Sequence, residues 1–138
     1  MLPNELFISH STLDQSFVTP LVELVRSHGI PVWHSRTNIV GAQQWHDEIG
    51  AALRRCDWFV IVLSPSSTGS TWVKRELLFA LNDNRYADKI IPLLYQPCDY
   101  EQLSWTLSLF QRVDFTTDFN EGCRELFRIW GIGYKSNS

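Results

Sequence analysis

Short apolar runs and helical stripes of apolar residues alternate along this chain of 138 residues. Runs rich in β-branched and aromatic residues predict strands at 5–9, 30–33, 58–63, 89–95 and 113–115. Apolar positions with helical spacing predict helices that begin near Ser11, Trp45, Thr71, Tyr100 and Asp118. Strict alternation of strand and helix with short connections is typical of a parallel sheet covered on both faces. We therefore expect an α/β fold, a flavodoxin-like doubly wound sheet of five parallel strands in the order 2-1-3-4-5.

Boundary signals refine the helices. Ser11 and Asp14 fit a capping box, so the first helix is expected to begin there, to bend or restart at Pro20, and to stop at Gly29. The segment 64–70 is expected to be a polar loop and 100–110 a short, weak helix.

The helix after the third strand is expected to take Ser70 or Thr71 as its N-cap. Its predicted inward stripe is Val73, Leu77, Leu78, Ala80 and Leu81.

Composition narrows the class of protein. A hydrophobic fraction of 44% supports a core, and we expect one domain over 1–138, with its core at about 5–130 and a tail at 131–138. A net charge of -3 with no Lys/Arg run argues against nucleic-acid binding. The apolar runs are far shorter than the roughly 20 residues of a membrane span, and the sequence shows no signal-peptide pattern. We therefore expect a cytoplasmic protein without membrane contact.

Two hydroxyl-rich loops are predicted to meet where the strand order reverses, between the first and third strands. Ser9, His10 and Ser11 follow the first strand, and the loop from Ser64 to Ser70 follows the third. Both loops lead into helix N-termini, where free backbone N–H groups and the helix dipole favour a phosphate. The same hydroxyls are also good helix caps, so an anion site and plain capping both remain open.

Trp72 and Glu76 are four residues apart on the helix that follows the third strand, so they share one face. That face lies beyond the carboxyl end of a central strand, where open α/β sheets bind ligands. A carboxylate there suits a ribose hydroxyl pair or positive charge at an anomeric carbon, and the indole suits a flat ring. The alternatives are a solvated surface glutamate and a core or interface tryptophan.

The long loop after the second strand holds further candidates. Arg36 is placed to meet a phosphate or a partner surface, or else solvent. We expect Trp33 to anchor the loop, whereas Trp45 is either an anchor or the wall of a pocket. The histidines and the cysteines (Cys56, Cys98 and Cys123) show no metal-ligand spacing, so no metal site is expected. Phosphate-loop, dinucleotide-fingerprint and GxSxG patterns do not occur in the sequence.

Seven segments in order resemble one known family. They are FISHSTLD at 7–14, GIPVW at 29–33, IVGAQQWHDEIGAAL at 39–53, VIVLSPSS at 60–67, STWVKREL at 70–77, IIPLLY at 90–95 and RVDF at 112–115. Together they make the chain similar to TIR (Toll/interleukin-1 receptor) domains of the bacterial type, over about 5–130.

The resemblance implies an activity and a site. Many members cleave NAD+ at the nicotinamide–ribose bond through a glutamate in a WxxxE pattern, which here is Trp72 to Glu76. It makes Glu76 the catalytic residue and Trp72 its neighbour, with NAD+ as substrate and no cofactor. The loop His34–Gln44 corresponds to the family's BB loop, which gates the pocket and mediates self-association. Many relatives carry an acidic residue just after the second strand, where this chain has His34 and Ser35.

The resemblance therefore implies an NAD+ glycohydrolase or cyclase that yields nicotinamide with ADP-ribose or a cyclic isomer. We expect it to serve bacterial antiphage defence or signalling as a homo-oligomer, with a separate sensor or effector protein as a further candidate partner. The alternatives are a TIR–TIR signalling scaffold without catalysis and an effector that interferes with host TIR signalling.

Overall fold

The computed structural model describes residues 2–34 and 42–135, with the side chains of 42–45 outside that description. The strands are β1 (Leu6–Ser9), β2 (Val32–His34), β3 (Trp58–Leu63), β4 (Ile90–Leu94) and β5 (Val113–Asp114). The α-helices are α1 (Gln15–Ser27), α2 (Ala42–Arg55), α3 (Pro65–Thr68), α4 (Thr71–Leu81) and α5 (Phe119–Ile129). Short 3-10 turns are η1 (Thr12–Asp14), η2 (Asn84–Tyr86), η3 (Tyr100–Gln102) and η4 (Trp105–Leu109).

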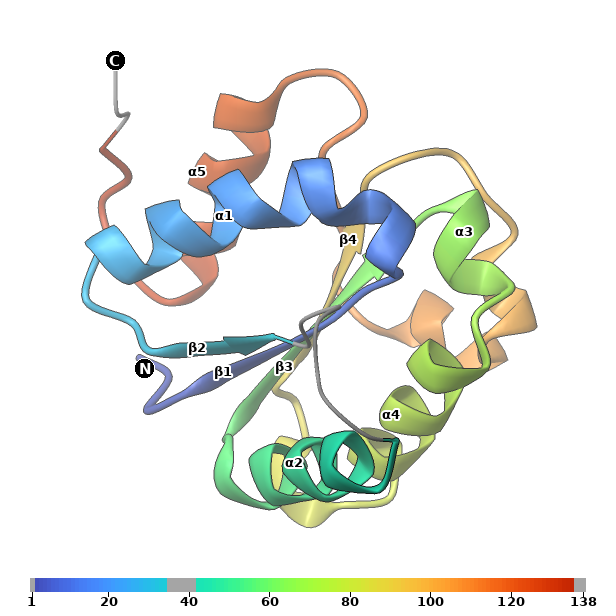
Figure 1. Ribbon diagram of the computed structural model, residues 1–138. Helices are drawn as coiled ribbons and strands as arrows, with labels where there is room; N and C mark the ends of the chain where they lie inside the picture. Colours follow the sequence, from blue (N-terminus) through green and yellow to red (C-terminus); the bar gives the residue numbers. More distant parts are fainter. Residues whose placement is uncertain (1, 35–41, 136–138) are drawn as a thin grey trace.

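The strands form one parallel sheet in the order β2-β1-β3-β4-β5, which confirms the predicted fold class (Figure 1). The order reverses between β1 and β3, where Ser9 is in register with Ile61. Pro31 lies just outside β2, an edge strand, as its missing N–H requires. The carboxyl ends of β1 and β3 therefore flank the predicted ligand crevice.

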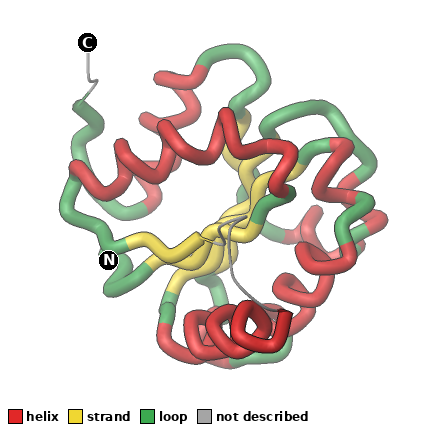
Figure 2. Tube along the Cα trace, viewed as in Figure 1, coloured by secondary structure: helices red, strands yellow, loops and turns green. Residues whose placement is uncertain are grey.

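Helices cover both faces of the sheet, with α1 and α5 on one side and α2 and α4 on the other (Figures 1 and 2). Leu6 and Ile8 of β1 pack on the α1/α5 side, while Phe7 packs on the α2/α4 side. Because strand residues alternate between the faces, Ser9 shares the face of Phe7 and points toward α2 and α4.

Three predicted elements need correction. The expected loop 64–70 contains the helical turn α3, which Ser64 caps in a capping box with Ser67 and which begins at Pro65. Helix α2 begins at Ala42 rather than near Trp45, because Ala and Gln at 42–44 favour helix. The expected helix over 100–110 is two 3-10 turns, because the Ser104 hydroxyl accepts from Thr106 N and starts a new turn.

Two further details differ from expectation. Helix α1 does not restart at Pro20, which is exposed and lies inside one continuous helix. Leu78 was expected on the inward stripe of α4 but is 43% exposed. Glu76, which was not part of that stripe, is buried. The Ser70 cap is confirmed, since its hydroxyl accepts from Val73 N at 3.2 Å.

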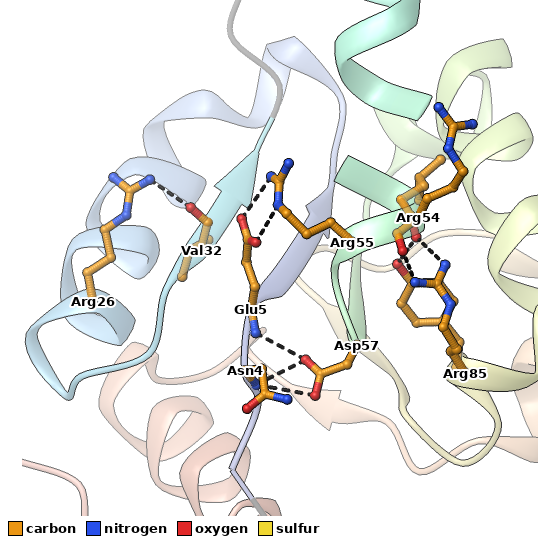
Figure 3. A network of polar contacts seen from close by, with 10 residues as sticks. Asn4, Glu5, Arg26, Val32, Arg54, Arg55, Asp57 and Arg85 are labelled. Atoms are coloured by element: carbon orange, nitrogen blue, oxygen red, sulfur yellow. Dashed lines mark hydrogen bonds and ion pairs between the residues drawn. The ribbon is translucent and has the colours of Figure 1, made fainter. Parts of the chain in front are cut away.

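A polar network closes the amino edge of the sheet, opposite the predicted crevice (Figure 3). The Asp57 carboxylate accepts from the backbone N–H groups of Asn4 and Glu5 at 3.0–3.2 Å. Arg55 forms an ion pair with Glu5 at 2.6 Å. These contacts join the starts of β1 and β3, while the candidate site lies at the carboxyl ends of the strands.

Within 2–34 and 42–135, no helix is both long enough and apolar enough to cross a membrane.

Candidate active site

The Glu76 carboxylate is buried against the end of the central strand β1. Ser9, the last residue of β1, donates a 2.5 Å hydrogen bond from Oγ to Glu76 Oε1. Glu76 is 5% exposed and Ser9 1% exposed. The alternation of β1 sends the serine toward α4, and the spacing of α4 puts Glu76 on the same inward face as Val73, Leu77 and Ala80. Two of the predicted site residues, far apart in sequence, are thus in direct contact.

Burial changes the chemistry of this carboxyl group. Loss of water around Glu76 raises its pKa to about 7, against a smaller opposite effect of the hydrogen bond from Ser9. A glutamate with this pKa holds and releases a proton near neutral pH, which suits a reacting group better than a structural one.

Trp72 lies one turn before Glu76 on α4 and is half-buried. Its ring meets His46 of α2 edge-on, with ring centroids 5.8 Å apart, and packs with the core residues under α2 and α4. The guanidinium carbon of Arg75 lies 5.3 Å from the centroid of the Trp72 ring. Trp72 therefore makes the contacts expected of a core tryptophan. It also lies on the same face of α4 as Glu76, as expected of a residue that stacks on a ligand ring.

His10 and Ser11 follow Ser9 directly and are both buried. His10 Nδ1 donates to Ser11 O at 2.9 Å, and its ring centroid lies 6.0 Å from that of His34 at the end of β2. The Ser11 hydroxyl accepts from Leu13 N and so caps η1. The loop after β1 therefore brings the imidazole of His10, the residue after Ser9, close to that of His34.

Ser64 is fully buried, and its hydroxyl has two partners. Ser64 Oγ donates to Asp14 Oδ2 at 2.5 Å and accepts from Ser67 N at 3.1 Å. The buried Ser64 side chain thus joins the loop after β3 to the segment after β1. The expected capping box of Ser11 and Asp14 does not form, because the Ser11 hydroxyl accepts from Leu13 N and the Asp14 carboxylate accepts from Ser64.

The remaining candidates fall where the structure is not described. Arg36 and most of the loop His34–Gln44 lie outside the described residues, as does the side chain of Trp45. Trp33 stacks on Phe7 of β1 with ring centroids 4.9 Å apart, so its ring packs on the sheet, while the loop it is expected to anchor lies outside the described residues. In the described ranges, no group of three or more His, Cys, Asp or Glu residues could hold a metal ion.

Sequence reasoning missed three residues of this region. Arg75 could have been noticed, because it is three positions after Trp72 on a helix and therefore beside it. His46 and Asp14 could not, because their partners lie on other elements and no local pattern links them.

Comparison with known proteins identifies the family. A sequence model described as "TIR domain" matches residues 6–127, from β1 into α5. The chain is 28% identical over 119 residues to the 2′ cyclic ADP-D-ribose synthase AbTIR of Acinetobacter baumannii, covering 84% of this chain and 44% of that protein. It is 26% identical over 102 residues to the NAD(+) hydrolase TcpC of Escherichia coli O6:H1, covering 72% and 33%. The chain thus spans less than half the length of these two curated relatives.

Solved structures agree on the fold. The TIR domain of the Toll-related receptor TRR-2 from Hydra magnipapillata superposes with a TM-score of 0.73 at 21% identity, over 90% of this chain and 95% of that one. The TIR domains of the activated Roq1 resistosome give 0.73 at 16% identity, over 92% and 99%. A prokaryotic SEFIR domain gives 0.71 at 15% identity, over 98% of both chains. With a family match that runs from the first strand into the last helix, the chain belongs to the TIR domain family.

Proposed function

We propose that this TIR domain cleaves NAD+ at the nicotinamide–ribose bond, with Glu76 as the catalytic residue. The observation that carries the proposal is the buried Glu76 carboxylate, bonded to Ser9 where the strand order reverses. Two curated relatives, named a 2′ cyclic ADP-D-ribose synthase and an NAD(+) hydrolase, support the reaction class.

The chemistry needs one well-placed negative charge. Nicotinamide in NAD+ is cationic and leaves as a neutral molecule, so it needs little help from an acid. The ribose carbon left behind develops oxocarbenium character, as in glycoside hydrolysis. An ionised Glu76 against the ribose stabilises that positive charge, and does so more strongly in a site that excludes water.

The second step decides the product. Attack by water at the ribose carbon gives ADP-ribose and releases one proton. Attack by another nucleophile of the same molecule closes a ring, gives a cyclic isomer and releases one proton from the attacking group. Both routes share the departure of nicotinamide, so both depend on Glu76.

We propose that seven further residues bind the substrate. Trp72 is proposed to stack on a flat ring of NAD+, and Arg36 to meet its phosphates. Ser9, His10, Ser11 and Ser64 on the two loops, with Trp45 on α2, complete the proposed set. Ser9 contacts Glu76 directly through its hydrogen bond.

Self-association belongs to the same proposal. We propose TIR–TIR contacts that include the loop His34–Gln44, in a bacterial defence or signalling setting, with a separate sensor or effector as a possible trigger. Nicotinamide release per molecule is then expected to rise with protein concentration. The measurement is specific activity against concentration, beside light scattering after size-exclusion chromatography.

The decisive experiment measures nicotinamide release from NAD+ by the purified protein at high concentration, with products resolved by mass. Glu76→Gln and Glu76→Ala are expected to lose at least a hundredfold in rate, the scale of a lost charge-stabilising group. Glu23→Gln, an exposed glutamate of α1, is the matched control and keeps wild-type activity.

Each other outcome has a clear meaning. Equal rates for wild type and Glu76→Gln would remove Glu76 from the mechanism. No release from the wild type, even when crowding forces assembly, would favour the scaffold without catalysis.

A further inference from the structure

Two buried side-chain hydrogen bonds join the same two segments of the chain. Ser9 donates to Glu76 across 67 positions, and Ser64 donates to Asp14 across 50 positions, each at 2.5 Å. One segment is 9–14, from the end of β1 through η1, and the other is 64–76, from the end of β3 through α3 into α4. The reacting carboxylate therefore lies at one end of a doubly linked pair of segments, and Asp14 at the other.

Hydrogen-bonded turns connect Ser64 to α4, the helix that carries Glu76. The Ser64 hydroxyl caps α3 by accepting from Ser67 N, and Ser67 Oγ donates back to Ser64 O at 3.1 Å. Ser70 N then donates to Ser67 O at 3.0 Å, and the Ser70 hydroxyl caps α4 at Val73 N. A run of short hydrogen-bonded turns thus leads from Ser64 to α4 without a free loop between them.

The segment that carries Asp14 is also a compact, hydrogen-bonded turn. Asp14 N donates to Ser11 O at 3.0 Å, which closes η1, and the Ser11 hydroxyl caps the same turn. His10 in turn donates to Ser11 O. Asp14 is 4% exposed, so its carboxylate is fixed inside the fold at the end of this compact turn.

We propose that Asp14 is a positioning residue for the reaction assigned to Glu76. By accepting from Ser64, it holds the segment 64–76 against 9–14 and so keeps the Glu76 carboxylate on Ser9. The inference rests on the proposed function, because positioning matters only if Glu76 reacts. A misplacement of about 1 Å at a reacting group can cost roughly a hundredfold in rate. The hydrogen bond between Asp14 and Ser64 can therefore affect turnover although it does not touch Glu76.

The test compares variants that break this bond with one that keeps it. Asp14→Ala and Ser64→Ala remove one partner each, whereas Asp14→Asn keeps an oxygen that can accept from Ser64. Asp57→Ala is the matched control: Asp57 also joins distant segments through its carboxylate, but at the opposite edge of the sheet (Figure 3). For each variant, kcat and KM of nicotinamide release, and the melting temperature, are measured.

Asp14→Ala and Ser64→Ala are expected to lower kcat about tenfold or more, and Asp14→Ala to keep KM within about threefold. Asp14→Asn is expected to stay near wild type. The double variant Asp14→Ala/Ser64→Ala is expected to lose no more than Ser64→Ala alone, because the bond between Ser64 and Asp14 is already absent in that single variant. Asp57→Ala is expected to lose melting temperature but not kcat. If Asp14→Ala and Ser64→Ala match Asp57→Ala at equal loss of melting temperature, the positioning role is wrong.

A second readout does not need activity. In protein with 13C-labelled glutamate carboxyl groups, the Glu76 resonance is identified by its absence in Glu76→Gln, and its titration midpoint is followed by NMR. Loosening the segments admits water, so Asp14→Ala is expected to lower the midpoint, whereas a midpoint equal to wild type overturns the proposal. A wild type that releases no nicotinamide would overturn the proposed function, and this titration would still decide the role of Asp14.

Discussion

Ser9 Oγ donates a 2.5 Å hydrogen bond to Glu76 Oε1, which joins the end of the central strand β1 to the middle of α4. Burial removes most of the water that would stabilise the carboxylate, and the serine returns only part of that stabilisation. The two residues thus hold an acid that ionises near neutral pH at the point where the strand order reverses. Three predictions depend on this pair.

The first concerns the pH dependence of activity. If the ionised form of Glu76 stabilises the ribose cation, kcat/KM should rise about tenfold per pH unit below the pKa and level off above it. With a pKa of about 7, the profile bends between roughly pH 6 and 8 and keeps falling below pH 6. The measurement is nicotinamide release at low NAD+ over pH 5–9. A profile that is flat across this range would contradict a reacting Glu76 carboxylate.

The second concerns Ser9. The hydrogen bond from Ser9 lowers the pKa of Glu76, so Ser9→Ala should raise this pKa further. The midpoint of the kcat/KM profile is then expected to move to higher pH than in the wild type, and the rate at pH 7 to fall. Ser27→Ala is the control, because the Ser27 hydroxyl bonds at the far end of α1, to Leu24 O and to His28 Nδ1. A Ser9→Ala midpoint at or below that of the wild type would show that the bond does not favour the carboxylate.

The third concerns stability. The folded protein keeps the Glu76 proton up to about pH 7, whereas an unfolded chain releases it near 4.5. Between these values the folded state binds more protons, so rising pH lowers the free energy of unfolding, by about 3 kcal/mol in full. Below pH 4.5 this penalty is absent. Glu76→Gln should therefore gain on the wild type as pH rises.

Urea unfolding at pH 5 and pH 8 checks this. The stability difference between Glu76→Gln and wild type is expected to grow in favour of the variant toward pH 8, while Glu23→Gln shows no such trend. A difference that stays constant between the two pH values would mean that Glu76 is not a destabilising buried acid.

The sheet could be predicted because its strands are apolar runs buried on both faces, such as Trp58–Leu63. The helical turn α3 could not, because Ser64, Pro65 and Ser67 suit both an irregular loop and a capped turn. The helix expected over 100–110 failed for a related reason: the Ser104 side chain competes locally for backbone N–H groups.

For the site, helix spacing and the family resemblance together indicated Trp72 and Glu76 as candidates, and the structure shows Glu76 bonded to Ser9 at the end of β1. The burial of Glu76 could not be predicted, since glutamate on a helix is usually solvated, and here its partner Ser9 comes from a distant strand. The pairing of Asp14 with Ser64 has the same character. Such contacts depend on how segments are packed, and local patterns do not encode them.

The last prediction tests the packing of α5 on the sheet. A Cβ at Gly122 would lie 2.4 Å from Phe115 Cδ1, and Phe115 is held edge-on by Phe17 at 5.2 Å between ring centroids. Gly122→Ala should therefore lower the free energy of unfolding by about 1–3 kcal/mol, despite alanine's better helix propensity. Gly69→Ala is the matched control, because a Cβ there meets nothing within 4 Å. It should leave stability within about 1 kcal/mol of wild type or raise it slightly. Equal stability of the two variants in urea would show that Phe115 can move aside, and that the α5 contact is looser than this geometry implies.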